Sequence, residues 1–155
     1  MPIARREAEI IWEGPLGGGT GTLTSGSGAL DQLAVTWASR TERPGGRTSP
    51  EELIAAAHAS CFAMALALRL DAHQTPPERL AVSAACTLDE VGRAPRITTV
   101  ELSVRAHVPG LAAADLEQIV GEAADLCPVS KALRGNVEVN AHSELVPAVE
   151  TTPIQ

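Results

Sequence analysis

Two cysteines in this sequence lie where a thiol could react. Cys61 is in the middle of an apolar stretch, and Cys127 comes directly before Pro128. Because proline favours the first position of a helix, we expect Cys127 to lie where a short helix begins. Backbone N–H groups at a helix N-terminus lower the pKa of a thiol, so this position favours ionisation of Cys127.

Cys61 receives no such help, because it is predicted to lie in mid-helix, and a reactive Cys61 therefore needs a cation nearby. The segment just before that helix contains three candidate arginines, Arg40, Arg43 and Arg47. A guanidinium stays charged and binds a carboxylate through two donors, so an arginine–glutamate pair beside the thiol would activate it. The residues leave open which of the three arginines acts.

His58 is one helical turn before Cys61, and two hypotheses remain open for it. The two side chains could form a cysteine–histidine dyad. Alternatively, His58 is a buried histidine that is satisfied by a hydrogen bond. The third cysteine, Cys86, lies on the apolar side of an alternating segment and is predicted to be a core residue.

The helix that carries Cys61 is predicted to begin after Ser49 and to end near residues 71–75, before Pro76 and Pro77. Ser49 is the expected N-cap, Pro50 takes the first helical position, and Glu52 completes a capping box. Residues 53–68 contain no formally charged side chain, which is typical of a helix buried on several sides. The helix is too short and too rich in alanine to predict a membrane span. One small sheet does not easily cover it, so we expect an obligate dimer.

The remaining pattern predicts an α+β fold with mainly antiparallel sheet. The glycine cluster at residues 14–21 precedes a strand signal, so it indicates a hairpin connection and not a phosphate-binding loop. Residues 89–96 are predicted to form a second hairpin loop. The expected strands cover 7–13, 20–24, 33–39, 80–88, 100–108 and 137–141, and the expected helices cover 112–126 and a short segment from residue 128.

Composition excludes several classes of function. The chain has 155 residues, a net charge of −7, a pI of about 5.0 and only three aromatic residues. This length predicts one domain, and the acidic balance argues against a nucleic-acid partner and against a membrane surface. The N-terminus has no apolar segment of a signal peptide, so we expect a cytoplasmic protein. Three cysteines without a C-x-x-C pair predict neither a structural disulfide framework nor a metal site.

The segments PEELIAAAHASCF and CPVSKAL, whose cysteines are 66 residues apart, together resemble the OsmC/Ohr superfamily of thiol-dependent organic hydroperoxide peroxidases. The similarity is to the OsmC branch in particular. It extends to the pattern W-E-G, G-x-G and S-G-x-L, which stands here at residues 12–14, 19–21 and 27–30. The resemblance covers nearly the whole chain up to about His142.

The resemblance implies an intertwined homodimer, with two central buried helices wrapped by sheets. It implies one OsmC-like domain over residues 1–146, and the tail over residues 147–155 is predicted to be disordered. By position, Cys61 matches the peroxidatic cysteine, Cys127 the resolving cysteine, Glu51 the active-site glutamate and Arg40 the activating arginine. An organic hydroperoxide would oxidise Cys61, a disulfide with Cys127 would follow, and an external dithiol reductant would reopen it. The resemblance implies no cofactor and suggests a role in the stress response.

Two rival functions use the same residues. One is a cysteine hydrolase using Cys61 and His58, and the other is a non-catalytic small-molecule-binding dimer of the same fold. Within the peroxidase hypothesis, Glu51 and Cys61 are ten residues apart, which is about 15 Å of helical rise. Either the helix is interrupted, or Glu51 of one protomer serves the thiol of the other. The lack of Gly and Pro in residues 53–68 favours the second geometry.

Overall fold

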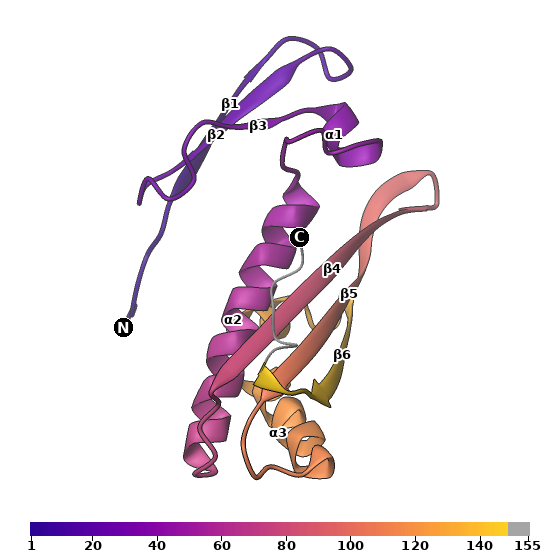
Figure 1. Cartoon of the computed structure of the whole chain (residues 1–155). Helices are drawn as coiled ribbons and strands as arrows, with labels where there is room; N and C mark the ends of the chain where they lie inside the picture. The colour runs from indigo at the N-terminus through magenta and orange to yellow at the C-terminus, as the bar shows by residue number, and fades with distance from the viewer. Residues whose placement is uncertain (149–155) are drawn as a thin grey trace. The chain divides into compact units, whose positions relative to one another are not determined.

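The secondary structure follows the order β1-β2-β3-α1-α2-β4-β5-α3-α4-β6 in a computed structural model that describes residues 1–148 (Figure 1). The predicted α+β class is confirmed. The chain divides into two compact units, Met1–Leu53 and Ile54–Gln155. Most of the tail predicted to be disordered, residues 149–155, lies outside the described residues.

The first unit contains a three-stranded antiparallel sheet in the order β1-β2-β3. Its strands are β1 (Ala8–Glu13), β2 (Thr20–Ser25) and β3 (Leu33–Val35). β1 and β2 are joined by the glycine cluster, so the predicted hairpin is confirmed. Gly19 shows why glycine is needed there, because an added Cβ would lie 2.5 Å from the carbonyl oxygen of Pro15.

The strand predicted over residues 33–39 is wrong in its second half, because β3 ends at Val35 and helix α1 (Trp37–Thr41) follows. A reciprocal cap starts this helix. The hydroxyl of Thr36 accepts from the amide of Ser39 at 3.0 Å, and the hydroxyl of Ser39 accepts from the amide of Thr36 at 2.9 Å. Two capping hydroxyls at this spacing favour a helix start over a continued strand. Arg40 is therefore on a helix and not in a loop.

Helix α2 (Pro50–Ala72) is continuous over 23 residues. The predicted N-cap is confirmed, because the amide of Glu52 donates to the hydroxyl of Ser49 at 3.2 Å. Contrary to the sequence expectation, α2 is long and apolar enough to cross a membrane by length and composition alone. However, Phe62, Leu66 and Leu70 are fully buried against other elements of the protein, as in the core helix of a globular domain.

The second unit contains a three-stranded sheet in the order β4-β5-β6. Strands β4 (Arg79–Val91) and β5 (Ala94–His107) pair antiparallel, and β6 (Glu138–Leu145) pairs parallel with β5. The hairpin loop predicted over residues 89–96 is shorter, because both strands extend to a turn at Gly92 and Arg93. These two residues have φ values of 59° and 66°, the left-handed conformation that a tight two-residue hairpin requires.

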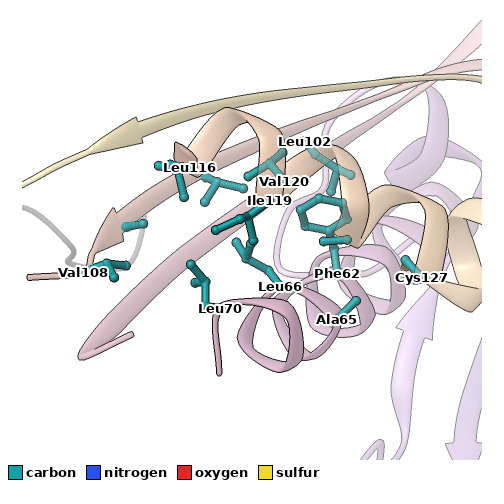
Figure 2. Packing of buried hydrophobic residues seen from close by; sticks show 13 residues of the cluster. Phe62, Ala65, Leu66, Leu70, Leu102, Val108, Leu116, Ile119, Val120 and Cys127 are labelled. Carbon is teal, nitrogen blue, oxygen red and sulfur yellow. The ribbon is translucent and has the colours of Figure 1, made fainter. Parts of the chain in front are cut away.

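The core of this unit lies between α2, β5 and α3 (Ala113–Leu126). Figure 2 shows side chains of α2 and α3 directed toward one another. The predicted apolar stripe of α3 is confirmed, since its buried residues are Leu116, Ile119, Val120 and Ala123. Burying one such large apolar side chain stabilises the fold by roughly 1.5–3 kcal/mol. α3 thus anchors the segment that follows it, which contains Cys127.

Two large apolar side chains of α2 are not covered within one chain. Met64 and Leu68, four residues apart, are 67% and 62% exposed. Side chains at this spacing lie on the same face of a helix. Exposed large apolar side chains that lie together are typical of an interaction surface.

Candidate active site

Cys61 and Cys127 meet within the second unit. Cys61 is half-buried on α2, and Cys127 is fully buried between α3 and α4 (Pro128–Leu133). The two free thiols are neighbours, since each influences the pKa of the other and the backbone amide of Val129 acts on both. Two thiols must lie close together in this way before an S–S bond can form between them.

Cys127 caps the N-terminus of α4, as the sequence predicts. Its sulfur accepts from the backbone N–H of Ser130 at 3.5 Å, and Pro128 occupies the first turn. Burial is the largest influence on this thiol and raises its pKa. Hydrogen bonds from the backbone and side chain of Ser130, from Cys61 and from the amide of Val129 outweigh burial, so the pKa of Cys127 lies below its ordinary value. Cys127 is therefore the more acidic thiol of the pair.

Cys61 has the opposite tendency. Burial raises the pKa of Cys61, and hydrogen bonding and charge repulsion from Cys127 raise it further, although the amide of Val129 opposes them. The groups that act on Cys61 within its own unit thus favour the thiol over the thiolate. A reactive Cys61 therefore needs a positive charge from elsewhere, which agrees with its position in mid-helix.

His58 is directed to Ser130 and not to the thiol of Cys61. Its Nε2 lies 2.7 Å from the hydroxyl oxygen of Ser130, and both side chains are buried. Burial keeps the pKa of His58 below its ordinary value, so the ring is neutral at neutral pH. Of the two hypotheses for this residue, the buried and hydrogen-bonded histidine is confirmed. The dyad that a cysteine hydrolase would use is not formed.

Arg40 and Glu51 form a bidentate ion pair within the first unit. Nη2 and Nε of Arg40 lie 2.7 Å and 3.0 Å from Oε1 of Glu51. The side chain of Glu51 is 9% exposed, whereas Arg43 and Arg47 are exposed. The guanidinium of Arg40 also lies 5.8 Å from the ring centroid of Trp37, within range of a cation–π contact. Of the three candidate arginines, Arg40 is therefore the one that forms an ion pair with Glu51.

Cys86 is half-buried on β4 and is not part of the thiol pair. The prediction that Cys86 is a core residue is wrong, because Cys86 is neither in the buried cluster nor among the residues packed against it. The predicted alternation holds around it, where Ala85 and Thr87 are exposed. Within residues 1–148, no group of three or more His, Cys, Asp or Glu side chains is arranged to hold a metal ion.

A family model described as OsmC-like protein matches residues 43–142. This chain belongs to the OsmC-like family. Among its relatives, Peroxiredoxin OsmC of Escherichia coli is 36% identical over 135 residues, which cover 87% of this chain and 94% of the relative. The organic hydroperoxide resistance protein of Xanthomonas axonopodis pv. citri is 34% identical over 125 residues, which cover 79% of this chain and 85% of the relative.

Solved structures support the same fold. An organic hydroperoxide resistance protein OsmC from Legionella pneumophila superposes with a TM-score of 0.72 at 26% identity, covering 93% of this chain and 99% of the other. OhrB of Bacillus subtilis gives the same TM-score and identity and covers 89% of this chain and 98% of its own. The OsmC-like assignment therefore applies to nearly the whole chain.

Sequence reasoning missed one residue beside Cys127 in the second unit and one residue beside Arg40 in the first unit. Ser130 received no role, although it lies in the CPVSKAL motif three residues after the capping cysteine, the position whose amide meets an N-cap side chain. Trp37 was assigned to a strand and received no role beside Arg40. The spacing from Cys127 is a signal that could have identified Ser130. Trp37 could be identified only by recognising the helix start at Thr36.

Proposed function

We propose that this OsmC-like protein is a thiol-dependent peroxidase that reduces organic hydroperoxides to alcohols. The observation that carries the proposal is the proximity of the Cys61 and Cys127 thiols, each of which influences the pKa of the other. A peroxidatic and a resolving thiol must meet in this way to form a disulfide without refolding. The names Peroxiredoxin OsmC and organic hydroperoxide resistance protein among the relatives support the same reaction class.

In the first step, the Cys61 thiolate attacks the terminal oxygen of the hydroperoxide. The O–O bond breaks, sulfur supplies the electron pair, and Cys61 becomes a sulfenic acid. The departing alkoxide takes up the proton that the thiol released and leaves as an alcohol. One oxygen atom is thereby transferred from the peroxide to sulfur.

In the second step, the Cys127 thiolate attacks the sulfur of the Cys61 sulfenic acid. The S–O bond breaks, the S–S bond forms, and hydroxide leaves as water after taking up one proton. An external dithiol then reduces the disulfide by thiol–disulfide exchange and restores both cysteines. The reduced, thiol-rich cytoplasm is the compartment in which such a reductant is available.

The thiol site is proposed to be completed by a second protomer. Because α2 is unbroken from Pro50 to Ala72, Glu51 and Cys61 are separated by about 15 Å of rise. A shared helix therefore does not bring Glu51 to the thiol of its own chain. We propose that the Arg40–Glu51 pair of one protomer supplies the positive charge to Cys61 of the other. The exposed apolar face at Met64 and Leu68 supports a homodimer that covers α2.

The proposed substrate has an apolar tail. Met64 and Leu68 follow Cys61 at intervals of three and four residues, so they share its face of α2. Phe62, which follows Cys61 in the sequence, is fully buried in the core and does not lie on this exposed face. In the proposed dimer these side chains would line a pocket beside the thiol at the interface, where an alkyl or aryl tail that leaves water gains about 0.8 kcal/mol per buried methylene. Hydrogen peroxide has no such tail.

The proposal is tested by following consumption of cumene hydroperoxide and hydrogen peroxide with dithiothreitol as the dithiol. The second-order rate constant should be at least about tenfold higher for cumene hydroperoxide, because only it can bury an apolar group. Cys61→Ser should abolish the reaction, and Cys86→Ser is the matched control that keeps it. Equal rate constants would contradict the substrate class. If neither peroxide is consumed, the rival hypothesis of a non-catalytic small-molecule-binding dimer is favoured. Ester hydrolysis that survives Cys127→Ser would indicate a cysteine hydrolase.

A further inference from the structure

The two ring nitrogens of His58 have different surroundings. Nε2 lies 2.7 Å from the hydroxyl oxygen of Ser130, whereas Nδ1 is buried with no hydrogen-bond partner among the described residues. A neutral histidine carries one ring proton, and a buried N–H without an acceptor is costly. The favoured tautomer therefore has its proton on Nε2, which donates to the oxygen of Ser130.

This arrangement fixes the direction of the Ser130 hydroxyl. Because its oxygen accepts a hydrogen bond from His58, its own proton is available for a second acceptor. The sulfur of Cys127 is the acceptor within reach, because the backbone N–H of Ser130 donates to it at 3.5 Å and the Ser130 side chain lowers the pKa of the same thiol. Two donors directed at one sulfur stabilise the thiolate over the thiol. His58 thus acts on Cys127 through Ser130, although it is only one turn from Cys61 on α2.

We propose that His58 and Ser130 form a positioning pair for the resolving thiol, holding Cys127 as the thiolate that attacks the Cys61 sulfenic acid. This inference rests on the proposed peroxidase function and assigns the pair to its second step. The groups that act on the Cys127 sulfur are Ser130 and the amide of Val129 from α4 and Cys61 from α2. None of these neighbours is a cation, so oriented hydrogen bonds take the place of a positive charge.

The pair is first tested without any peroxide, by titration of Cys127. In a Cys61→Ser, Cys86→Ser background Cys127 is the single thiol, and the chain contains no tyrosine that would obscure the ultraviolet absorbance of the thiolate. Ser130→Ala and His58→Leu should each raise the titration midpoint by about one pH unit, the effect of losing one hydrogen bond to a charged group. His58→Gln places an amide N–H where it can reach Ser130 and should restore the midpoint. A midpoint unchanged in both Ser130→Ala and His58→Leu overturns the proposal.

Single-turnover kinetics with cumene hydroperoxide give the second test. Trapping with dimedone reports the Cys61 sulfenic acid, and loss of free thiols reports the disulfide. Ser130→Ala and His58→Leu should slow disulfide formation about tenfold more than sulfenic acid formation. Equal slowing of both steps would indicate a structural role and overturn the assignment. If the parent protein consumes no hydroperoxide, the peroxidase function fails, while the titration still decides whether the pair acts on Cys127.

Discussion

Arg40 holds the carboxylate of Glu51 through two different nitrogens. Nη2 and Nε lie 2.7 Å and 3.0 Å from Oε1, and Nε also lies 3.2 Å from Oε2. A guanidinium has five N–H donors, so this pair leaves several of them for another anion. The almost fully buried glutamate fixes the orientation of the arginine without removing its charge from the site. A pair of this kind is suited to stabilising a thiolate.

Removing this charge is expected to lower peroxidase activity. Arg40→Met should slow cumene hydroperoxide consumption at least about tenfold, because the Cys61 thiolate loses the cation that offsets its burial. Arg40→Lys keeps the charge but loses the two-point contact with Glu51, so its rate should be intermediate. Arg43→Met is the matched control, since Arg43 is an exposed arginine of the same segment. A larger loss in Arg43→Met than in Arg40→Met would reassign the activating residue.

Oxidation should join Cys61 to Cys127 and leave Cys86 as a thiol. One equivalent of cumene hydroperoxide is added to the reduced protein, free thiols are alkylated under denaturing conditions, and the peptides are identified by mass spectrometry. The expectation follows from the proximity of the Cys61 and Cys127 thiols and from the separate position of Cys86 on β4. Recovery of Cys127 as an alkylated thiol, or of Cys86 in the disulfide, would contradict it.

The contact between α2 and α3 predicts a loss of stability in acid. Glu122 of α3 is bonded by His73, at 3.0 Å, and by Arg69, and these partners lower its pKa from 4.5 to about 2. Because the folded pKa is below the unfolded one, the unfolded chain binds more protons in this range. The stabilisation is therefore complete above pH 4.5 and is lost as the pH falls toward 2.

Glu122→Gln removes this titration, so the melting temperature should fall less steeply between pH 4.5 and 2 than in the parent protein. The measurement uses one fixed protein concentration, because the protein is proposed to be a dimer. Glu117→Gln, at an exposed position of the same helix, is the control and should keep the slope of the parent protein. The same slope in Glu122→Gln as in the parent would show that other carboxyl groups control acid unfolding.

Local sequence signals predicted most of the second unit, because its elements follow simple rules. The alternation of β4 and β5 and the apolar stripe of α3 are set by side chains within each element. The parallel pairing of β6 with β5 was not predicted, because it depends on how the chain returns after α3 and α4. The motif around Cys127 predicted a helix start, and the structure places the thiol there.

The contacts that tune the site were less accessible from sequence. His58 and Ser130 are 72 residues apart, so their hydrogen bond depends on the packing of α4 against α2. The choice of Arg40 among three arginines rested on a family resemblance, and the ion pair with Glu51 now gives it a geometric reason. That ion pair requires helix α1, whose start depends on the cap between Thr36 and Ser39. A pattern of apolar residues alone does not reveal such a cap.

The composite site predicts complementation between two inactive proteins. On the unbroken helix α2, ten steps of about 100° place Glu51 and Cys61 roughly 80° apart around the axis, in addition to their separation along it. If Arg40 and Glu51 of one protomer serve the thiol of the other, Cys61→Ser and Glu51→Ala damage different halves of each site. A mixed dimer then contains one site with both defects and one site with neither.

Subunit exchange between Cys61→Ser and Glu51→Ala should therefore restore activity toward cumene hydroperoxide. At equal concentrations and random exchange, half of the dimers are mixed and each has one intact site, so about a quarter of the parent activity is expected. The double variant Cys61→Ser, Glu51→Ala mixed with the parent protein is the matched control, because its mixed dimers have one defect in each site and no intact site. Native mass spectrometry shows whether the mixed dimers form. If they form but stay inactive, Glu51 and the thiol that it serves lie on the same chain.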